Sequence, residues 1–330
     1  MPRIPIAGTP AGFTERQVTL GEVTLNYVEG PDHGRPLLLI PGQMESWQGY
    51  KQVLPALAER FHVFVPDVRG HGRSSRTPGA YSYNLCGQDL AAFLQQVIGQ
   101  PALVSGLSSG GVLSIWLGAY APEHVLAVIS EDPPIFASIW PRIQQERHMA
   151  YGFQVAVDTL GGPERDLKGW LSKVGYPPPG ETELRHIPGF IVSGLYGWTR
   201  LWQRLRPGRP YDIPLFSFNL RMGLMGLSEY DPDFSLATVD GRLSEGFDPE
   251  DALRRVRCPM LLLRANARRH ETWGLLGAMD DDDVARVEAL VADLKVVPVA
   301  CEHAIHMLEP EAWLAAVTGF VDELEESGRI

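Results

Sequence analysis

Cysteine and basic residues are scarce in this chain, and it contains no long apolar run. Its three cysteines among 330 residues are too few and too scattered for a disulfide framework or a metal site, and they indicate a reducing compartment. Lys and Arg number 29 against 40 Asp and Glu, and the net charge of −11 argues against nucleic acid or anionic membrane as a partner. No stretch approaches the roughly 20 apolar residues of a membrane span, and residues 1–8 lack the apolar core of a signal peptide. We therefore expect a cytoplasmic protein; homo-oligomerisation is left open.

Short apolar runs alternate with helical patterns in two parts of the chain. Runs that are apolar throughout are typical of strands buried on both faces, and their alternation with helices predicts an α/β fold with a mostly parallel sheet. The predicted strands are 17–20, 24–28, 36–40, 62–65, 102–105, 126–130, 259–263 and 295–299. The predicted helices are 48–59, 84–98, one beginning near Ser109, 284–294 and 310–324.

The alternation stops in the middle of the chain. From about residue 133 to residue 255 the sequence is rich in proline, glycine and aromatic residues, and four of the eight tryptophans lie there. The simplest interpretation is a core formed by residues 14–133 and 256–330, with residues 134–255 inserted as a mainly helical lid.

One motif with chemical meaning follows the predicted strand 102–105. Residues 106–110 read Gly-Leu-Ser-Ser-Gly, and a helix begins there. This is the G-x-S-x-G pattern of a nucleophile elbow, in which a sharp strand-to-helix turn exposes the serine at the carboxyl end of the sheet. Ser108 is thus the candidate nucleophile, and the amide of Ser109 at the helix N-terminus is a candidate oxyanion donor.

With this motif in place, the chain resembles the α/β hydrolases. Residues 67–74 read Asp-Val-Arg-Gly-His-Gly-Arg-Ser and match the D-x-R-G-x-G-x-S loop of that superfamily. We expect Asp67 and Arg69 to organise this turn rather than to contact substrate. The run Asp280 to Asp283 is expected to cap a helix, not to bind a cation.

The resemblance also implies the base and the acid of a catalytic triad. His303 occupies the position of the catalytic histidine in an H-x-x-H-x-x-x-P segment that precedes the last helix. No aspartate follows the strand 259–263 where most relatives carry the acid, so the alternative position after strand 126–130 is favoured. Asp132 is the first candidate there; Glu131 is its near rival and Glu271 a distant third.

The second oxyanion donor is expected in the loop after strand 36–40. Many relatives have His-Gly in this loop, whereas this chain has Pro41-Gly42-Gln43. Pro41 has no amide hydrogen, so the donor is the amide of Gln43 or, as the alternative, that of Gly42. Alignment with the relatives named below favours Gln43.

Three features together are similar to the zearalenone lactone hydrolases, above all the bacterial ones. These are the Gly-x-Ser-Ser-Gly elbow, the oxyanion loop that begins with proline, and the acid in Glu131-Asp132-x-Pro. The resemblance implies hydrolysis of a macrocyclic resorcylic lactone, without a metal or an organic cofactor. The aromatic insertion suits an apolar ester or lactone substrate, and the candidate substrate contacts there are Trp198, Trp202 and Phe218. His306 is a further candidate contact, for which a role in packing is the favoured alternative.

Other activities of the same fold stay open. A general carboxylesterase and a C–C bond hydrolase would use the same triad. Epoxide hydrolases and haloalkane dehalogenases are disfavoured, because these relatives carry aspartate where this chain has Ser108. A ligand receptor derived from a hydrolase is less consistent with a chain that holds candidates for all three triad positions.

Overall fold

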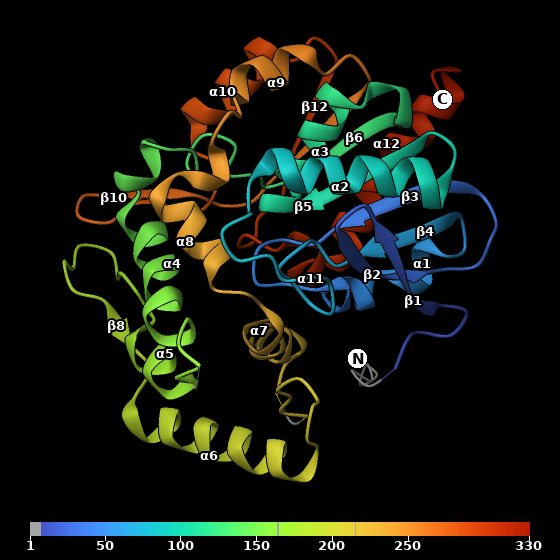
Figure 1. The fold of residues 1–330 in the computed structure, drawn as a ribbon. Helices are drawn as coiled ribbons and strands as arrows, with labels where there is room; N and C mark the ends of the chain where they lie inside the picture. Colours follow the sequence, from blue (N-terminus) through green and yellow to red (C-terminus); the bar gives the residue numbers. More distant parts are fainter. Residues whose placement is uncertain (1–7, 164, 215) are drawn as a thin grey trace.

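The computed structural model describes residues 8–163, 165–214 and 216–330. Its centre is an eight-stranded sheet in the order β1-β2-β4-β3-β5-β6-β9-β12 (Figure 1). The strands are β1 (Thr14–Leu20), β2 (Val23–Glu29), β3 (Arg35–Ile40), β4 (Phe61–Pro66), β5 (Ala102–Leu107), β6 (Val125–Glu131), β9 (Met260–Arg264) and β12 (Leu294–Pro298). The two antiparallel pairings of this sheet, β1 with β2 and β2 with β4, both involve β2, and its other five pairings are parallel, so the predicted mostly parallel sheet is confirmed.

The central strands bury side chains on both faces of the sheet, as their continuous apolar sequences predict. In β3, Leu38 and Ile40 belong to one apolar cluster, whereas Leu37 and Leu39 belong to the other. This alternation follows from the two-residue period of a strand. Helices are therefore needed on both faces.

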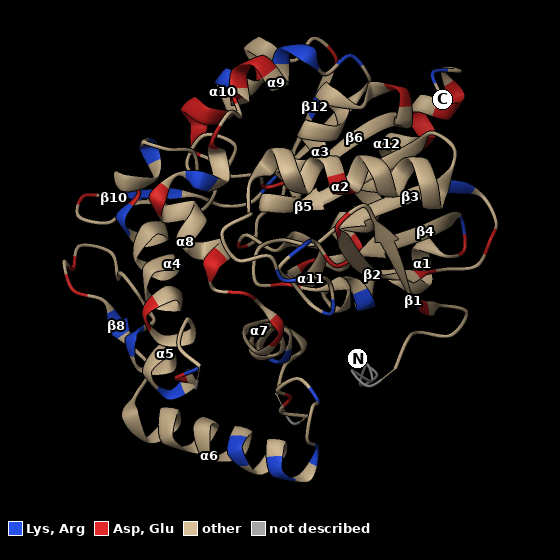
Figure 2. Ribbon diagram, viewed as in Figure 1, with Lys and Arg blue, Asp and Glu red and all other residues tan. Residues whose placement is uncertain are grey.

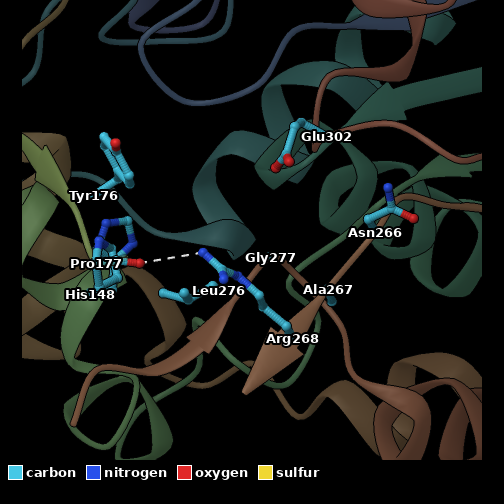
Figure 3. Close-up of a pocket in the computed structure, with 9 residues that line it drawn as sticks. All are labelled: His148, Tyr176, Pro177, Asn266, Ala267, Arg268, Leu276, Gly277 and Glu302. Atoms are coloured by element: carbon cyan, nitrogen blue, oxygen red, sulfur yellow. Dashed lines mark hydrogen bonds between the residues drawn. The ribbon is translucent and has the colours of Figure 1, made fainter. Parts of the chain in front are cut away.

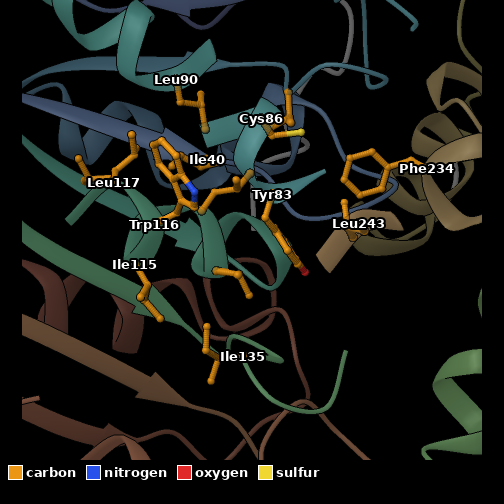
Figure 4. Packing of buried hydrophobic residues seen from close by; sticks show 14 of the residues in the cluster. Ile40, Tyr83, Cys86, Leu90, Ile115, Trp116, Leu117, Ile135, Phe234 and Leu243 are labelled. Atoms are coloured by element: carbon orange, nitrogen blue, oxygen red, sulfur yellow. The ribbon is translucent and has the colours of Figure 1, made fainter. Parts of the chain in front are cut away.

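The first cluster is covered by α2 (Tyr83–Phe93), α3 (Ser109–Tyr120), α9 (Pro249–Arg255) and α10 (Asp281–Leu290). Figure 4 shows side chains of α2 and α3, such as Leu90, Trp116 and Leu117, packed within it. The second cluster is covered by α1 (Leu54–Leu57) and α12 (Pro310–Glu326). The result is a three-layer arrangement with helices on each side of the sheet.

Several elements differ from the sequence prediction. The expected helix 48–59 is a 3₁₀ helix over Trp47–Gln52 followed by the single turn of α1, and the last turn of the expected helix 84–98 is a π-helical turn over Leu94–Ile98. Two small sheets were not predicted: β7 (Gly175–Tyr176) pairs with β8 (Arg185–His186), and β10 (Arg268–His270) pairs with β11 (Gly274–Leu276). Strands of two or three residues carry too little alternation to be recognised in a sequence.

The segment between β6 and β9 is mainly helical. It contains α4 (Arg147–Leu160), α5 (Leu167–Lys173), α6 (Gly189–Leu205), α7 (Phe218–Glu229), α8 (Asp233–Asp240) and α9. Phe234 of α8 and Leu243 reach into the first core cluster (Figure 4), and α9 packs against α3 and α10 of the core. None of the described helices is long and apolar enough to cross a membrane.

The loop after β4 is organised as the sequence predicts. The carboxylate of Asp67 accepts hydrogen bonds from the amides of Trp47 and Arg73, at 2.8 and 3.1 Å. The guanidinium of Arg69 forms a bidentate ion pair with Asp89. These interactions fix the turn, so the structural interpretation of the two residues is confirmed. Asp280 likewise forms a capping box with Asp283 at the start of α10.

Candidate active site

Ser108 lies at a strained turn between β5 and α3. Its backbone angles are φ 56° and ψ −120°, a conformation that non-glycine residues seldom adopt. A Cβ at Gly106 would lie 2.1 Å from the carbonyl oxygen of Gly110, and a Cβ at Gly110 would lie 2.2 Å from that of Ile40. Only glycine fits at both positions, which explains the two glycines of the motif. The amide of Ser108 donates to the carbonyl of Glu131 at 2.9 Å and ties the turn to β6.

His303 and Asp132 are joined by a short hydrogen bond. Nδ1 of His303 lies 2.6 Å from Oδ2 of Asp132, so the bond to the carboxylate places a proton on Nδ1 and leaves Nε2 free. The other carboxylate oxygen accepts from the amide of Ala265 at 3.2 Å, and Asp132 is almost fully buried. Its neighbour Glu131 contacts a different histidine, His306. The structure therefore pairs Asp132, and not Glu131, with His303.

Ser108, His303 and Gln43 line one cavity of about 280 Å³. The rest of its wall is mainly apolar and comes from the segment after β6, from α4 and from the chain that includes β11. These residues are Pro134, His148, Met149, Phe153, Leu275, Gly277 and Ala278. The arrangement places a hydroxyl, an imidazole and an apolar surface around one space, as hydrolysis of an apolar ester requires.

A second cavity of about 420 Å³ adjoins the first, because His148 and Gly277 belong to the walls of both. Figure 3 shows Arg268 extending across it toward Pro177, whose carbonyl accepts a hydrogen bond from the guanidinium at 3.3 Å. The bond connects β10 to the segment between α5 and α6. Together the two cavities offer more space than a small acyl group needs.

The oxyanion loop lies directly beside the nucleophile. A Cβ at Gly42 would lie 3.3 Å from Cβ of Ser108, and the side-chain amide of Gln43 donates to Ser235 of α8 at 2.9 Å. The backbone amide of Gly42 donates to the carboxylate of Glu45 at 3.3 Å. The backbone amide of Gln43, by contrast, donates no hydrogen bond to any of the described residues. The geometry thus favours Gln43 over Gly42 as a donor, with Ser109 at the start of α3 as the other candidate.

Comparison with known proteins agrees with this architecture. A family model for the alpha/beta hydrolase fold matches residues 35–154, and a hydrolase from Pseudomonas aeruginosa superposes with a TM-score of 0.64 over 94% of this chain and 99% of that one, at 19% identity. The chain has the α/β-hydrolase fold. The family model covers about a third of the chain, and the structural likeness at 19% identity shows the fold.

The curated proteins to which this chain is similar are named for several different reactions. The 2-(acetamidomethylene)succinate hydrolase of Mesorhizobium japonicum is 25% identical over 94% of this chain and 96% of its own length. The 3-oxoadipate enol-lactonase 2 of Acinetobacter baylyi is 31% identical over 34% of this chain and 42% of its own length. The bifunctional epoxide hydrolase 2 of Sus scrofa is 34% identical over 44% of this chain and 27% of its own length. All three proteins are named for hydrolytic activities, but on different substrates.

The four residues expected to contact substrate lie outside the cavity beside Ser108. The indole nitrogens of Trp198 and Trp202 donate to the carbonyls of Asp212 and Pro210, at 2.8 and 2.9 Å. Phe218 packs beside two methionines of α7. None of these three, nor His306, is among the residues that line the cavity beside Ser108. Trp198, Trp202 and Phe218 were predicted from the aromatic composition of the inserted segment, but composition does not indicate which face of a helix lines the cavity.

Three residues of α4 that line the cavity were not predicted from the sequence, namely His148, Met149 and Phe153. The helix has an amphipathic pattern in which Val155, Ala156, Thr159 and Leu160 are buried, and this pattern alone would have predicted a helix packed on the core. It would not have revealed that the first turns of α4 extend to the nucleophile.

A second carboxylate–histidine pair lies beside the pair of Asp132 and His303. His306 of α11 (Ile305–Leu308) donates its amide and its Nδ1 to Glu131, at 2.9 and 3.0 Å, and both side chains are fully buried. Its ring stacks on Tyr50 with centroids 4.1 Å apart. His306 is therefore closed to substrate in this structure, and its place is structural: it anchors the loop that carries His303.

The pKa of His303 is raised above its ordinary value of 6.5. Burial lowers this pKa, but the hydrogen bond to Asp132 and the charges of Asp132, Glu45 and Glu131 together outweigh burial. Asp132 therefore stabilises the imidazolium, which is the form that a general base adopts when it takes up a proton.

This raised pKa predicts the acid limb of the pH–activity profile. A general base must be neutral, so kcat/KM should rise with pH through the pKa of His303, with its midpoint above 6.5. Replacing Asp132 with asparagine removes the charge and should move the midpoint to lower pH. Initial rates of aryl ester hydrolysis across the pH range measure the midpoint for the wild type and for the Asp132→Asn variant. A wild-type midpoint at or below 6.5 would contradict the assignment of His303 as base.

Proposed function

We propose that this α/β hydrolase is a serine hydrolase of carboxylic esters and lactones, with Ser108 as nucleophile, His303 as general base and Asp132 as its acid partner. The observation that carries the proposal is the convergence of the elbow serine and the Asp132-bound histidine on one apolar cavity. The elbow carries serine, not the aspartate expected of an epoxide hydrolase, so ester chemistry is favoured.

In the proposed reaction Oγ of Ser108 attacks the ester carbonyl while Nε2 of His303 takes its proton. The carbonyl oxygen becomes an oxyanion and accepts hydrogen bonds from the amides of Gln43 and Ser109. Collapse of this intermediate breaks the C–O bond, and His303 returns the proton to the leaving alcohol. In a lactone that alcohol stays attached to the acyl chain. A water molecule, deprotonated by His303, then releases the acid and restores Ser108.

The substrate that we propose is a macrocyclic resorcylic lactone of the zearalenone type. The Gly-Leu-Ser-Ser-Gly elbow, the Pro41 oxyanion loop and the acid after β6 support it by resemblance. Met149, Phe153, Leu275 and Ala278 give the cavity an apolar wall, which suits a substrate bound by burial and ring contacts. The enol-lactonase among the relatives acts, by its name, on a lactone.

A hydrolysis time course on zearalenone beside a short-chain aryl ester tests the substrate. Rapid opening of the lactone by the wild type, absent in Ser108→Ala, is the expected result. Cleavage of the aryl ester alone would reject the lactone and leave a general carboxylesterase. Cleavage of a C–C bond in a ring-cleavage product, with neither ester hydrolysed, would favour the C–C hydrolase.

We further propose that the reaction takes place in the cytoplasm. Cys86, Cys258 and Cys301 are all free thiols in the structure, as expected of a protein kept in a reducing compartment.

A further inference from the structure

The oxyanion loop after β3 contains a tight turn over residues 42–45. The amide of Glu45 donates to the carbonyl of Gly42 at 3.2 Å, and the amide of Gly42 donates to the carboxylate of Glu45 at 3.3 Å. Met44, the third residue of the turn, has a φ of 65°, in the left-handed region that favours glycine. A methionine in this conformation costs free energy, so contacts outside the turn must hold it there.

Helix α7 of the inserted segment lies directly against Met44. A Cβ at Gly226 would lie 1.7 Å from the carbonyl oxygen of Met44 and 2.9 Å from its carbonyl carbon. Gly226 is buried, and only glycine lets the backbone of α7 approach the turn so closely. Gly223 is on the same helix, but a Cβ there would meet nothing within 4 Å. The close approach therefore belongs to the side of α7 that contacts the turn.

The side chain of Gln43, the second residue of the turn, is held by hydroxyl groups of the inserted segment. Its amide nitrogen donates to Oγ of Ser235 at 2.9 Å and to the hydroxyl of Tyr230 at 3.4 Å. Its amide oxygen accepts from the hydroxyl of Thr238 at 3.5 Å. All three hydroxyl-bearing residues are buried. The backbone amide of Gln43 is the candidate oxyanion donor, so bonds that fix this side chain also limit the movement of the donor.

The part of the inserted segment that makes these contacts is itself attached to the core. Figure 2 shows acidic residues along the connection between α7 and α8. The amide of Asp231 donates to the carbonyl of Gly70 at 2.8 Å, and its carboxylate accepts from the hydroxyl of Tyr81 at 2.6 Å. The carboxylate of Asp233 accepts from the amide of Gly79 at 2.6 Å. These bonds join α7 and α8 to the loop between β4 and α2, so both contacts with the turn have a fixed base.

We propose that Gly226, Ser235 and the side chain of Gln43 are positioning residues of the oxyanion hole. They hold the turn so that the backbone amide of Gln43 faces the oxyanion that forms at Ser108. This role rests on the reaction proposed for Ser108. Preorganised donors act on the charge that develops in the transition state, so a displaced turn slows the chemical step and leaves binding of the planar ester nearly unchanged. Activity thereby depends on how α7 and α8 are docked.

Gly226→Ala tests the contact with Met44. The added methyl group would displace the turn, and we expect kcat for an aryl ester to fall about 100-fold, the cost of losing one oxyanion donor, with little change in KM. Gly223→Ala is the matched control, because it makes the same change on the same helix in open space, and it should keep the kcat of the wild type. A thermal unfolding curve reports folding. Wild-type kcat in Gly226→Ala, or an equal loss in both variants, would overturn the role of Gly226.

Inhibition by a trifluoromethyl ketone analogue of the ester locates the loss. Oγ of Ser108 adds to the ketone carbonyl, the hydroxyl proton passes to His303, and the carbonyl oxygen becomes an oxyanion in the hole. In Gly226→Ala the inhibition constant should rise by the factor by which kcat/KM falls, whereas that of the matching methyl ketone should stay unchanged. An unchanged inhibition constant for the trifluoromethyl ketone would reject the positioning role alone. A wild type that binds both ketones equally would reject the serine mechanism as well.

A double-mutant cycle keeps the role falsifiable if Gly226→Ala does not fold. Gln43→Leu keeps the backbone amide but loses the bonds to α8, and Ser235→Ala removes the nearest bonding partner. Each should lower kcat about tenfold, and the double variant should lose no more than the larger single loss, because both changes remove one contact. Thr199→Ala is the control, since this buried hydroxyl bonds within its own helix, to the carbonyl of Tyr196. Additive losses in the cycle, or an equal loss in the control, would contradict the proposal.

Discussion

Replacing Ser108 with alanine is expected to reduce kcat for ester hydrolysis by roughly 10⁶-fold, the loss typical of a serine hydrolase without its nucleophile. The change removes one oxygen atom from a side chain that lines the cavity. The strained turn is held by the close approach of Gly106 and Gly110 and by the bond from the Ser108 amide to Glu131, none of which needs the hydroxyl. Steady-state rates and a thermal unfolding curve measure activity and folding separately.

Ser109→Ala is the matched control for this experiment. It deletes a hydroxyl at the next position but keeps the backbone amide that is the candidate oxyanion donor, so activity should fall by no more than about tenfold. Retention of full activity by Ser108→Ala, or an equal loss in both variants, would contradict the role of Ser108.

Replacing Asp132 with asparagine is expected to reduce kcat about 10⁴-fold, the loss seen when the acid of a serine-protease triad is changed in this way. Asparagine can donate to Nδ1 of His303 as well as accept from it, so the ring is no longer held in the form that keeps Nε2 free. The negative charge that stabilises the imidazolium is also lost. The measurement is kcat on the substrate that the wild type cleaves fastest.

Glu131→Gln is the matched change one residue away. Glu131 contacts His306 and not His303, so we expect kcat to fall no more than about tenfold while the free energy of unfolding drops by about 3 kcal/mol, the cost of breaking a buried ion pair. A loss of kcat larger in Glu131→Gln than in Asp132→Asn would show that the acid is misassigned.

The sheet and the elbow could be predicted because their signals are local. The central strands are apolar throughout, and the glycines of the elbow are required by contacts within a few residues and by the close passage of β3. Adjacent residues at a strand end point to opposite sides, so the sequence could also predict that only one of Asp132 and Glu131 contacts the catalytic histidine. The structure then shows which side carries His303.

The cavity wall could not be predicted in the same way. His148, Met149 and Phe153 reach Ser108 because α4 crosses the carboxyl end of the sheet, and that position depends on contacts with α8 and β11. These partners lie far away in the sequence, and no periodicity within α4 encodes them. Trp198 and Trp202 were predicted on composition, but their hydrogen bonds hold them within the inserted segment, away from the cavity.

Covalent labelling with a fluorophosphonate, which reacts with an activated serine, tests the nucleophile directly when it is followed by peptide mapping. We expect stoichiometric phosphonylation of Ser108 in the wild type, retained in Ser109→Ala and absent in Ser108→Ala. We also expect slow labelling of Asp132→Asn, because the serine is activated through His303. Labelling at another residue, or labelling that persists without the Ser108 hydroxyl, would contradict the proposed nucleophile and with it the proposed mechanism.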